Sequence, residues 1–382
     1  MMREHRCPHR PGIMAEPRVP ASRPRDASLR VHLTNVQGEG AVQLMGSLLP
    51  AIERQQDAAI RRIDLPDRGD LAGYCALSGS TLAKRHRRRL PNALSRLIEC
   101  IRPLAQDDGG ALLVLGDVPL RARGRQTVFV HNTHLLAHQP GVPAAQALKF
   151  LAMRAVFRRN LSHAARIVVQ TDLMRRALTA AYPSLEGRVR VVRQPPPQWL
   201  LRHAPPARHS RGTRGLRVFY PAAAYPHKNH ALVEALATRL HGSPSLEEIV
   251  VTLDPPGGGA AGGAIRHVGR LGPAGMRDHY ARADALFFPS LAESYGLPLI
   301  EAIWLGMPVV CADLPYAHEL CGDQALYFDP HDPASAEAAV TALADRLDAG
   351  WTPDWARARA AMPRDWDEVA RALVRIATDD QA

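Results

Sequence analysis

Residues 287–302 read FFPSLAESYGLPLIEA. The apolar run 285–288 predicts a buried strand that leads into this stretch. Pro298 suits the first turn of a helix, where a missing N–H does no harm, and Gly306 is a helix-stop signal. A further apolar run begins at Pro308 and predicts the next strand. The order strand, loop, helix, strand is the repeating unit of a parallel α/β sheet.

The loop of this unit carries Glu293, and Glu301 follows it eight positions later. A loop at the carboxyl end of a parallel strand is where such sheets bind ligands. Free amides around Gly296 and Leu297, together with the helix dipole, suit an anionic group such as a diphosphate. Glu293 can accept hydrogen bonds from sugar hydroxyls, and Glu301 from the two hydroxyls of a ribose. The alternative is a pair of surface glutamates beside an ordinary turn.

The same stretch resembles the retaining glycosyltransferases of family 4, the glycosyl transferases group 1, which have the GT-B fold. The pattern P-S-x-x-E-x-x-G-x-P-x-x-E-A, then G-x-P-V-V, is present without a gap, and the match continues to Pro330. The family usually has Gly and Phe where this chain has Ser294 and Tyr295, which belong to the same donor-binding loop. The resemblance implies that Glu293 contacts the donor sugar and that Glu301 contacts the ribose.

The resemblance also implies the architecture, an α/β fold with two Rossmann-like domains that face a central cleft. At 382 residues the chain is long enough for two cores. Segments rich in Pro, Arg and His predict a tail and a linker. We expect a disordered tail at 1–28, an N-terminal acceptor domain at 29–195, a linker at 196–214, a C-terminal nucleotide-sugar donor domain at 215–360, and a helix at 361–382 that packs back on the first domain.

Two features of the first domain point to the same cleft. A strand predicted at 29–36 is followed by a loop with Gly38 and Gly40, which lacks the full G-x-G-x-x-G spacing. These glycines face the donor phosphates or the acceptor, or they form only a tight turn. His131 ends a strand predicted at 127–131, and the resemblance gives it a contact with the donor sugar. The alternative for His131 is a structural histidine.

The phosphate side of the pocket departs from the family pattern. Many family-4 enzymes have an arginine six residues before a lysine, and both contact the donor diphosphate. Lys228 stands at the lysine position, but Ala222 replaces the arginine. Lys228 can still neutralise phosphate charge. We expect Asn229 to cap the following helix and to belong to the donor-binding site. His227 and Arg270 are the substitutes for the missing cation; otherwise the site is impaired.

The charge is unevenly distributed along the chain. Residues 1–200 carry 31 Lys and Arg and 15 Asp and Glu, a net charge of +16, whereas residues 201–382 carry 17 and 22, a net of −5. A basic half suits an anionic surface or a lipid-diphosphate substrate. The basic cluster 84–89 precedes an amphipathic helix at 90–104, which suits docking on anionic membrane. The alternative is a core-facing helix whose basic end is solvated.

Several classes of protein are not expected from this sequence. It has no apolar run near eighteen residues that could span a membrane, and its N-terminus lacks the core of a signal peptide. Five cysteines without a C-x-x-C pair read as reduced thiols. The acidic pair around Trp366 suits a helix N-terminus better than a metal motif, so we expect no metal and no cofactor. With 5% aromatic residues, nucleic acid is not an expected partner.

The resemblance predicts retaining transfer of a hexose from a nucleotide-diphosphate sugar to a glycan or lipid-linked acceptor. We expect it to serve surface polysaccharide or lipopolysaccharide synthesis, in the cytoplasm and peripherally at the inner membrane face. The expected catalytic residues are Glu293, His131 and Lys228. Glu293 and Glu301 do not form the acid and base pair of a hydrolase. The alternatives are a GT-B-like epimerase or hydrolase, and a non-catalytic nucleotide-sugar-binding protein.

Overall fold

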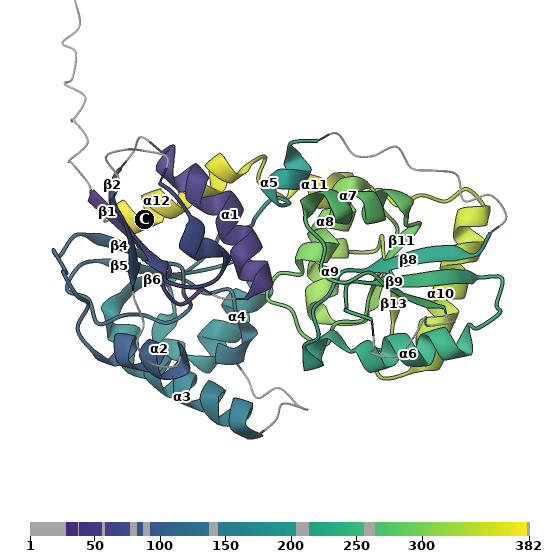
Figure 1. Ribbon diagram of the computed structural model, residues 1–382, viewed down its shortest axis with the longest axis horizontal. Coiled ribbons are helices and arrows are strands. Elements are labelled where there is room, and N and C mark those ends of the chain that lie inside the picture. The colour runs from purple at the N-terminus through teal and green to yellow at the C-terminus, as the bar shows by residue number, and fades with distance from the viewer. Residues whose placement is uncertain are drawn as a thin grey trace, which may run out of the picture.

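Two parallel sheets lie side by side in the computed structural model (Figure 1). The structure describes residues 28–36, 38–55, 58–76, 82–86, 92–136, 144–203, 214–255 and 264–379. The first sheet has seven strands in the order β3-β2-β1-β4-β5-β6-β7, and the second has six in the order β10-β9-β8-β11-β12-β13. Every pairing between these strands is parallel. The predicted α/β fold with two domains is therefore confirmed.

The first domain is a sheet with helices on both faces. Its strands are β1 (Ser28–His32), β2 (Ala59–Pro66), β3 (Leu82–His86), β4 (Ala111–Val114), β5 (Gln126–Phe129), β6 (Ala164–Val169) and β7 (Val189–Val191). Its helices are α1 (Glu39–Glu53), α2 (Asn92–Ile101), α3 (Ala144–Asn160) and α4 (Asp172–Ala181), with short 3-10 turns η1 (Asp70–Gly73), η2 (Thr133–Leu135), η3 (Leu161–His163) and η4 (Pro183–Leu185). Helix α1 covers one face, and α2 to α4 cover the other (Figure 1).

The second domain contains the unit predicted from residues 287–302. Its strands are β8 (Leu216–Tyr220), β9 (Leu246–Val251), β10 (Ile265–His267), β11 (Ala285–Phe288), β12 (Val309–Ala312) and β13 (Leu326–Phe328). Its helices are α6 (His230–Arg239), α7 (Pro273–Arg282), α8 (Leu297–Leu305), α9 (Pro315–Cys321), α10 (Pro333–Asp348) and α11 (Ala356–Ala360), with the short turn η5 (Pro226–Lys228). The predicted unit is β11, α8 and β12, and α8 ends at Gly306 with a left-handed φ of 72°.

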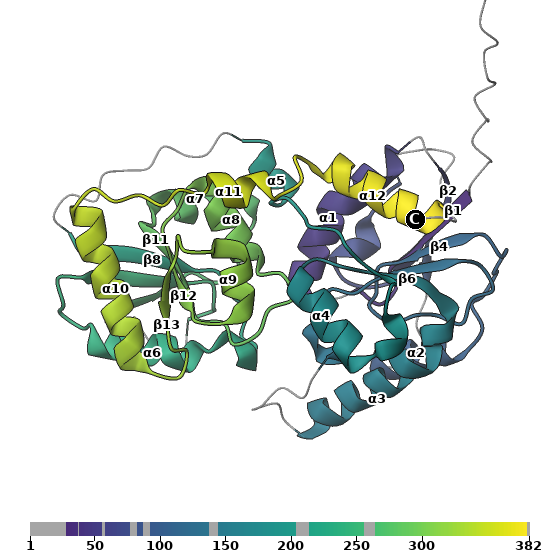
Figure 2. The same ribbon diagram turned by 180° about the vertical axis from the view of Figure 1, so that it is seen from behind.

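The last helix returns to the first domain, as predicted. Helix α12 (Trp366–Thr378) packs beside α1, on the face of the first sheet opposite α3 (Figure 2). The Trp366 indole is 1% exposed and donates to the carbonyl oxygen of Pro196 at 2.9 Å. Asp365 caps the helix, since its carboxylate accepts from the N–H of Glu368 at 2.8 Å. The acidic residues around Trp366 therefore form a helix N-terminus.

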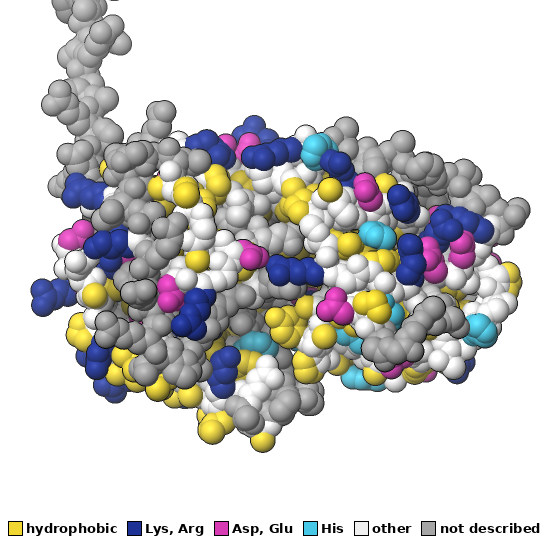
Figure 3. All heavy atoms as spheres, viewed as in Figure 1, with side chains coloured by type: hydrophobic (Ala, Val, Ile, Leu, Met, Phe, Trp, Pro, Cys, Tyr) yellow, Lys and Arg dark blue, Asp and Glu magenta, His cyan; other side chains and the backbone are white. Residues whose placement is uncertain are grey.

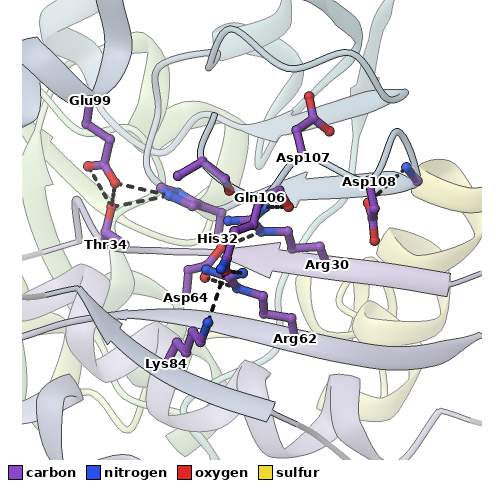
Figure 4. Close-up of polar contacts among 12 residues, drawn as sticks. Arg30, His32, Thr34, Arg62, Asp64, Lys84, Glu99, Gln106, Asp107 and Asp108 are labelled. Carbon is purple, nitrogen blue, oxygen red and sulfur yellow. Dashed lines mark hydrogen bonds and ion pairs between the residues drawn. The ribbon is translucent and has the colours of Figure 1, made fainter. Parts of the chain in front are cut away.

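A polar cluster joins β1 to α2 and to the segment after it (Figure 4), and β1 ends earlier than predicted. His32 Nε2 lies 3.2 Å from Glu99 of α2, and Arg30 donates to the carbonyl oxygens of Ala105 and Gln106. Arg30 Nε donates to the buried carboxylate of Asp64 at 2.6 Å. Two residues past His32, the Thr34 hydroxyl donates to the α2 carboxylate of Glu99 at 2.8 Å. Polar contacts thus hold α2 where apolar packing would be usual.

Some predicted segments differ from the structure or lie outside its described residues. Ser28, predicted as the end of the tail, is the first residue of β1, and residues 1–27 are not described. Of the basic cluster, Lys84 lies in edge strand β3 and 87–89 are not described. The predicted linker contains a short helix, α5 (Gln198–Leu201), before the undescribed residues 204–213.

Candidate active site

Two loops of the second domain are bound to each other and hold the candidate site. The loop after β11 meets the loop after β8, where the N–H of Leu291 donates to the carbonyl oxygen of His227 at 2.7 Å. The Ser290 hydroxyl donates to the same oxygen at 3.3 Å. The Tyr220 hydroxyl donates to the carbonyl oxygen of Lys228 at 2.6 Å. The backbones that carry Lys228 and Glu293 are therefore fixed relative to one another.

Lys228 and Glu293 form an ion pair at the junction of these loops. Lys228 Nζ lies 2.5 Å from Glu293 Oε1, and the two side chains are 14% and 12% exposed. The ammonium also lies 5.7 Å from the centre of the Phe288 ring, a cation–π distance. A cation that is largely removed from water interacts strongly with an anionic ligand. This pair brings together two of the three residues that the sequence predicts to be catalytic.

Asn229 supports the loops but does not reach the cleft. Its backbone adopts a left-handed conformation with φ 55° at the start of α6, and its side chain makes no capping hydrogen bond. Its amide nitrogen instead donates to the carbonyl oxygens of Pro289 at 3.3 Å and Pro330 at 2.9 Å. Asn229 therefore stands at the predicted N-cap position, but its side chain joins three loops and does not cap the helix.

Gly296 turns the chain from the loop into α8. Its φ of 79° favours glycine, and a Cβ there would lie 3.3 Å from a methyl carbon of Leu299. Leu297 begins the helix, Pro298 has no N–H, and Leu299 donates to the carbonyl oxygen of Gly296 at 2.9 Å. The N–H of Leu297 is therefore the amide at this helix start without an intrahelical acceptor. Across the cleft, a Cβ on Gly40 would lie 3.8 Å from Leu297 Cδ1. Gly40, predicted in a loop, lies in the first turn of α1. The N-terminus of α1 therefore faces the N-terminus of α8.

Glu301 is buried between the two domains. It lies one turn into α8 and is 2% exposed. Its Oε2 accepts from the Tyr280 hydroxyl at 2.6 Å, and its Oε1 accepts from Gln43 Nε2 of α1 at 3.0 Å. Burial raises the pKa of Glu301 to about 7, although both hydrogen bonds act in the opposite direction. Sequence reasoning found Glu301 but missed both partners.

Tyr295 points into the hinge between the domains. Its ring is 3% exposed. Its hydroxyl accepts from the N–H of Gln194 at 3.0 Å and donates to the carbonyl oxygen of the same residue. The backbone of the neighbouring Ser294 accepts from the Thr171 hydroxyl at 3.5 Å. Both residues border the cleft, but the Tyr295 hydroxyl is committed to the first domain.

Tyr295→Phe tests whether this hydroxyl serves the hinge or the donor. We expect the free energy of unfolding to fall by about 1–3 kcal/mol, since the variant leaves two buried backbone groups of Gln194 unpaired. Urea unfolding measures this loss, and calorimetry of nucleotide binding should give an unchanged Kd. Tyr327→Phe is the matched control, because its more exposed hydroxyl donates to Gly322. Lost nucleotide affinity with unchanged stability would make Tyr295 a donor ligand.

His131 lies beyond the end of β5 and beside a carboxylate. Its N–H donates to Asp117 Oδ1 at 2.8 Å, and its Nδ1 lies 3.3 Å from the same oxygen. Asp117 is 6% exposed and has a left-handed φ of 66°. Asp117 follows strand β4, so the rule that strand ends carry ligands could have identified it. The carboxylate holds the backbone of His131 and lies beside its ring.

A single cleft collects the predicted site residues from both domains. Its volume is about 1630 Å³. Of the predicted site residues, all but Asn229 line it: Gly38, Gly40, His131, Lys228, Glu293, Ser294, Tyr295, Gly296, Leu297 and Glu301. Ala222, at the position of the missing arginine, lines it too. Arg270 also borders the cleft, 3.1 Å from Asp70 of the first domain.

The comparisons with known proteins agree with this geometry. Residues 217–346 match the family model described as glycosyl transferases group 1. The second domain is a glycosyl transferases group 1 domain. The predicted resemblance is thus confirmed at the level of a GT-B glycosyltransferase of group 1, whereas family 4 and retention remain predictions.

The chain also has curated relatives. Over 70 residues, 18% of this chain and 20% of the relative, it is 39% identical to the O-antigen chain mannosyltransferase RfbU of Salmonella typhimurium. Over 74 residues, 19% of each chain, it is 38% identical to the O-antigen chain mannosyltransferase B of Escherichia coli. The matches span about a fifth of the length of these relatives.

Solved structures match both domains. WaaG, a glycosyltransferase involved in lipopolysaccharide biosynthesis, matches with a TM-score of 0.58 at 15% identity, over 92% of this chain and 95% of WaaG. Anabaena Alr3699/HepE in complex with UDP and glucose matches with a TM-score of 0.56 at 14% identity, over 92% of this chain and 95% of that one. At these identities the likeness shows the GT-B fold.

Neither a metal-binding cluster nor a membrane-spanning helix is found among the described residues. Within the described ranges, no group of three or more His, Cys, Asp or Glu side chains could hold a metal ion. No helix in the same part of the chain is long and apolar enough to cross a membrane.

Proposed function

We propose that this protein is a retaining, metal-independent hexosyltransferase that uses a nucleotide-diphosphate sugar. The observation that carries the proposal is the placement of the Lys228–Glu293 pair beside the N-terminus of α8, in one cleft with Glu301. The three groups match three parts of such a donor. Lys228 and the α8 amides suit the diphosphate, Glu293 the sugar hydroxyls, and Glu301 the ribose.

The proposed reaction transfers one glycosyl group from the diphosphate to the acceptor. The bond between the anomeric carbon and the diphosphate oxygen breaks, and its electron pair stays on the diphosphate. Lys228 and the amides of Gly296 and Leu297 stabilise this charge as it develops. The acceptor hydroxyl bonds to the anomeric carbon on the face that the diphosphate leaves, and its proton passes to the leaving phosphate. His131, beside Asp117, lines the same cleft and is our candidate for a contact with the donor sugar.

The acceptor side of the cleft is formed by aromatic, histidine and lysine side chains. His134 stacks on Phe150, with ring centres 3.8 Å apart. On the second-domain side of the cleft, Tyr225 stacks on His227, with ring centres 5.7 Å apart. Lys149 lines the same cavity. Flat rings suit the faces of sugar rings, and a cation suits a phosphate-bearing acceptor. We therefore propose a glycan or lipid-linked acceptor, in surface polysaccharide or lipopolysaccharide synthesis at the cytoplasmic membrane face.

Ligand binding and product analysis test the function. Thermal-shift assays with UDP, GDP, ADP and their sugars should give a rise in melting temperature with one nucleotide. Because the curated relatives are named mannosyltransferases, the mannose conjugates come first. Product NMR should show the donor's anomeric configuration in the new bond. An inverted product would refute retention, and loss of transfer on removing metal with a chelator would refute metal independence.

Two other functions are separated by the same assays. An epimerase or hydrolase would convert the sugar nucleotide without any acceptor, so incubation with donor alone identifies it. A binding protein would show the thermal shift but no turnover with any acceptor. The alanine at 222 is the feature that favours this second alternative.

Glu293→Ala tests the donor-sugar role of this carboxylate. We expect a fall in kcat of about tenfold or more, since a hydrogen bond to a charged group contributes about 1.5–3 kcal/mol. The Kd for the free nucleotide, which lacks the sugar, should change little. Steady-state kinetics and calorimetry measure the two effects. Glu337→Gln, at an ion pair with Arg239 on the surface, is the control. Transfer at the parent rate would remove Glu293 from the site.

A further inference from the structure

The first domain gathers exposed apolar side chains on one face. Among the described residues, five large hydrophobic side chains are exposed, and four of them belong to α2 and α3: Leu94, Ile101, Leu148 and Leu151. Leu148 and Leu151 are 68% and 59% exposed. The fifth, Tyr225, lies in the cleft. Figure 3 shows hydrophobic side chains along the lower edge of the first domain, where Figure 1 places these two helices.

The outer face of α3 is apolar where a surface helix is usually polar. The helix buries Phe150 and Phe157 against the domain. Its last residue, Asn160, donates to the carbonyl oxygens of Cys100 and Pro119, both at 2.8 Å. Leu148 and Leu151, three positions apart, therefore share the face that points away from the core. Removing each leucine side chain from water, by contact with another apolar surface, would be favourable.

An arginine-lined pocket lies at the C-terminal end of α3. Its volume is about 570 Å³. Three arginines line it, Arg158, Arg159 and Arg188, and none of its described lining residues is acidic. The Arg158 guanidinium lies 5.6 Å from the centre of the Tyr182 ring. The Arg188 guanidinium donates to the carbonyl oxygens of Ser184, Leu161 and Ala164. The exposed Arg158 and Arg159 therefore supply the guanidinium groups that suit a phosphate.

Further arginines crowd the same end of the domain. Burial lowers the pKa of Arg166, and neighbouring Arg190, Arg125 and Arg188 lower it further. Like charges that are this close favour the binding of an anion. The exposed leucines and this basic end lie along one helix of 17 residues, about 25 Å long. Apolar and basic groups along one surface match the two layers of an anionic bilayer.

We propose that α2, α3 and the arginine pocket form a docking surface for a bilayer that contains anionic phospholipid. The four exposed apolar side chains enter the boundary of the acyl chains, and the pocket takes the phosphate of a lipid headgroup. The other side of α3 lines the cleft through Lys149, Phe150 and Met153. Docking through α3 therefore presents the acceptor side of the cleft to the membrane. The docking proposal rests on the exposed side chains and the pocket, and it does not depend on which sugar the cleft transfers.

Vesicle flotation with the full chain tests the surface. The parent protein should float with vesicles of phosphatidylcholine and about 30% phosphatidylglycerol, and not with phosphatidylcholine alone. The double variants Leu148→Gln with Leu151→Gln, and Arg158→Gln with Arg159→Gln, should each lower the partition coefficient about tenfold or more. The matched control is Arg371→Gln with Arg375→Gln, two exposed arginines on α12 at the opposite face.

Each outcome decides the proposal. Equal flotation with neutral and anionic vesicles overturns it, and so does parent-like flotation of either double variant or an equal loss in the α12 control. Size-exclusion chromatography that shows a dimer in the parent and a monomer in the leucine variant assigns the face to a protein partner instead. Retained thermal shift with the nucleotide shows that a variant is folded. If the leucine variant does not fold, the arginine variant, which changes only exposed groups, still gives the answer.

Discussion

Lys228→Met is expected to lower kcat about 10²–10³-fold, with a much smaller change in the Kd for the nucleotide. The ammonium is held by two joined loops beside Glu293. In the proposed reaction, charge develops on the leaving diphosphate at this position. Ala222 replaces the arginine that would share this charge, so the loss should be larger than for one member of a pair. An interaction that strengthens in the transition state appears in kcat, and not in ground-state binding. Steady-state kinetics and calorimetry separate the two.

The double variant and one control sharpen this result. Lys228→Met leaves the Glu293 carboxylate beside the diphosphate without its partner, and some of the loss is their repulsion. The double variant Lys228→Met with Glu293→Gln should therefore raise the activation free energy by less than the sum of the increases in the two single variants. Arg270→Gln changes an exposed arginine paired with Asp70 and should alter kcat little. If Arg270→Gln lowers kcat as much as Lys228→Met does, Arg270 is the substitute for the missing arginine. A parent-like kcat in Lys228→Met would refute the catalytic role of Lys228.

The strand, loop and helix around 287–302 could be predicted because several local signals agree. Pro298 at the first turn, Gly306 at the end and the apolar spacing all favour one helix, and α8 runs from Leu297 to Leu305. The same signals place Glu293 and Gly296 in the loop. Such signals act within a few residues, so they do not depend on the rest of the fold.

The partners of the site residues could not be predicted in the same way. Gln43 and Tyr280 bind Glu301 from two other helices, one of them in the other domain. Nothing in the local sequence of either residue marks this contact. Tyr295 lies at a predicted donor position, yet its hydroxyl direction is set by Gln194, 101 positions away. Side-chain direction depends on tertiary packing, which spacing along the chain does not encode.

The burial of Glu301 makes its contribution to stability depend on pH. The pKa is about 7 in the folded chain against a usual 4.5, so the folded state binds more protons between these values. The free energy of unfolding therefore falls as the pH rises through this window, by up to about 3 kcal/mol. Below about pH 4.5 the carboxyl is protonated in both states and this penalty is absent. Nucleotide affinity should rise over the same range, because the ionised carboxylate is the better acceptor for ribose hydroxyls.

Glu301→Gln is accordingly expected to change stability and binding in opposite directions. The variant removes the buried charge and keeps an oxygen for the Tyr280 hydroxyl, although its amide meets that of Gln43. We expect a gain of about 1–2 kcal/mol in unfolding free energy at pH 8 and little change at pH 5. Nucleotide affinity should fall about 10–100-fold, since a neutral amide is a weaker acceptor than a carboxylate.

Urea unfolding at the two pH values and calorimetry with the nucleotide measure both effects of Glu301→Gln. Glu337→Gln, which changes a surface carboxylate paired with Arg239, should alter neither by more than about 0.5 kcal/mol. Equal destabilisation of Glu301→Gln at pH 5 and pH 8 would contradict the buried charge. Unchanged affinity would contradict the ribose contact. A gain in stability with a loss of affinity would indicate that the carboxylate serves ligand binding. Its burial as a charge opposes folding, whereas in the proposed function the charge strengthens the hydrogen bonds to the bound ribose.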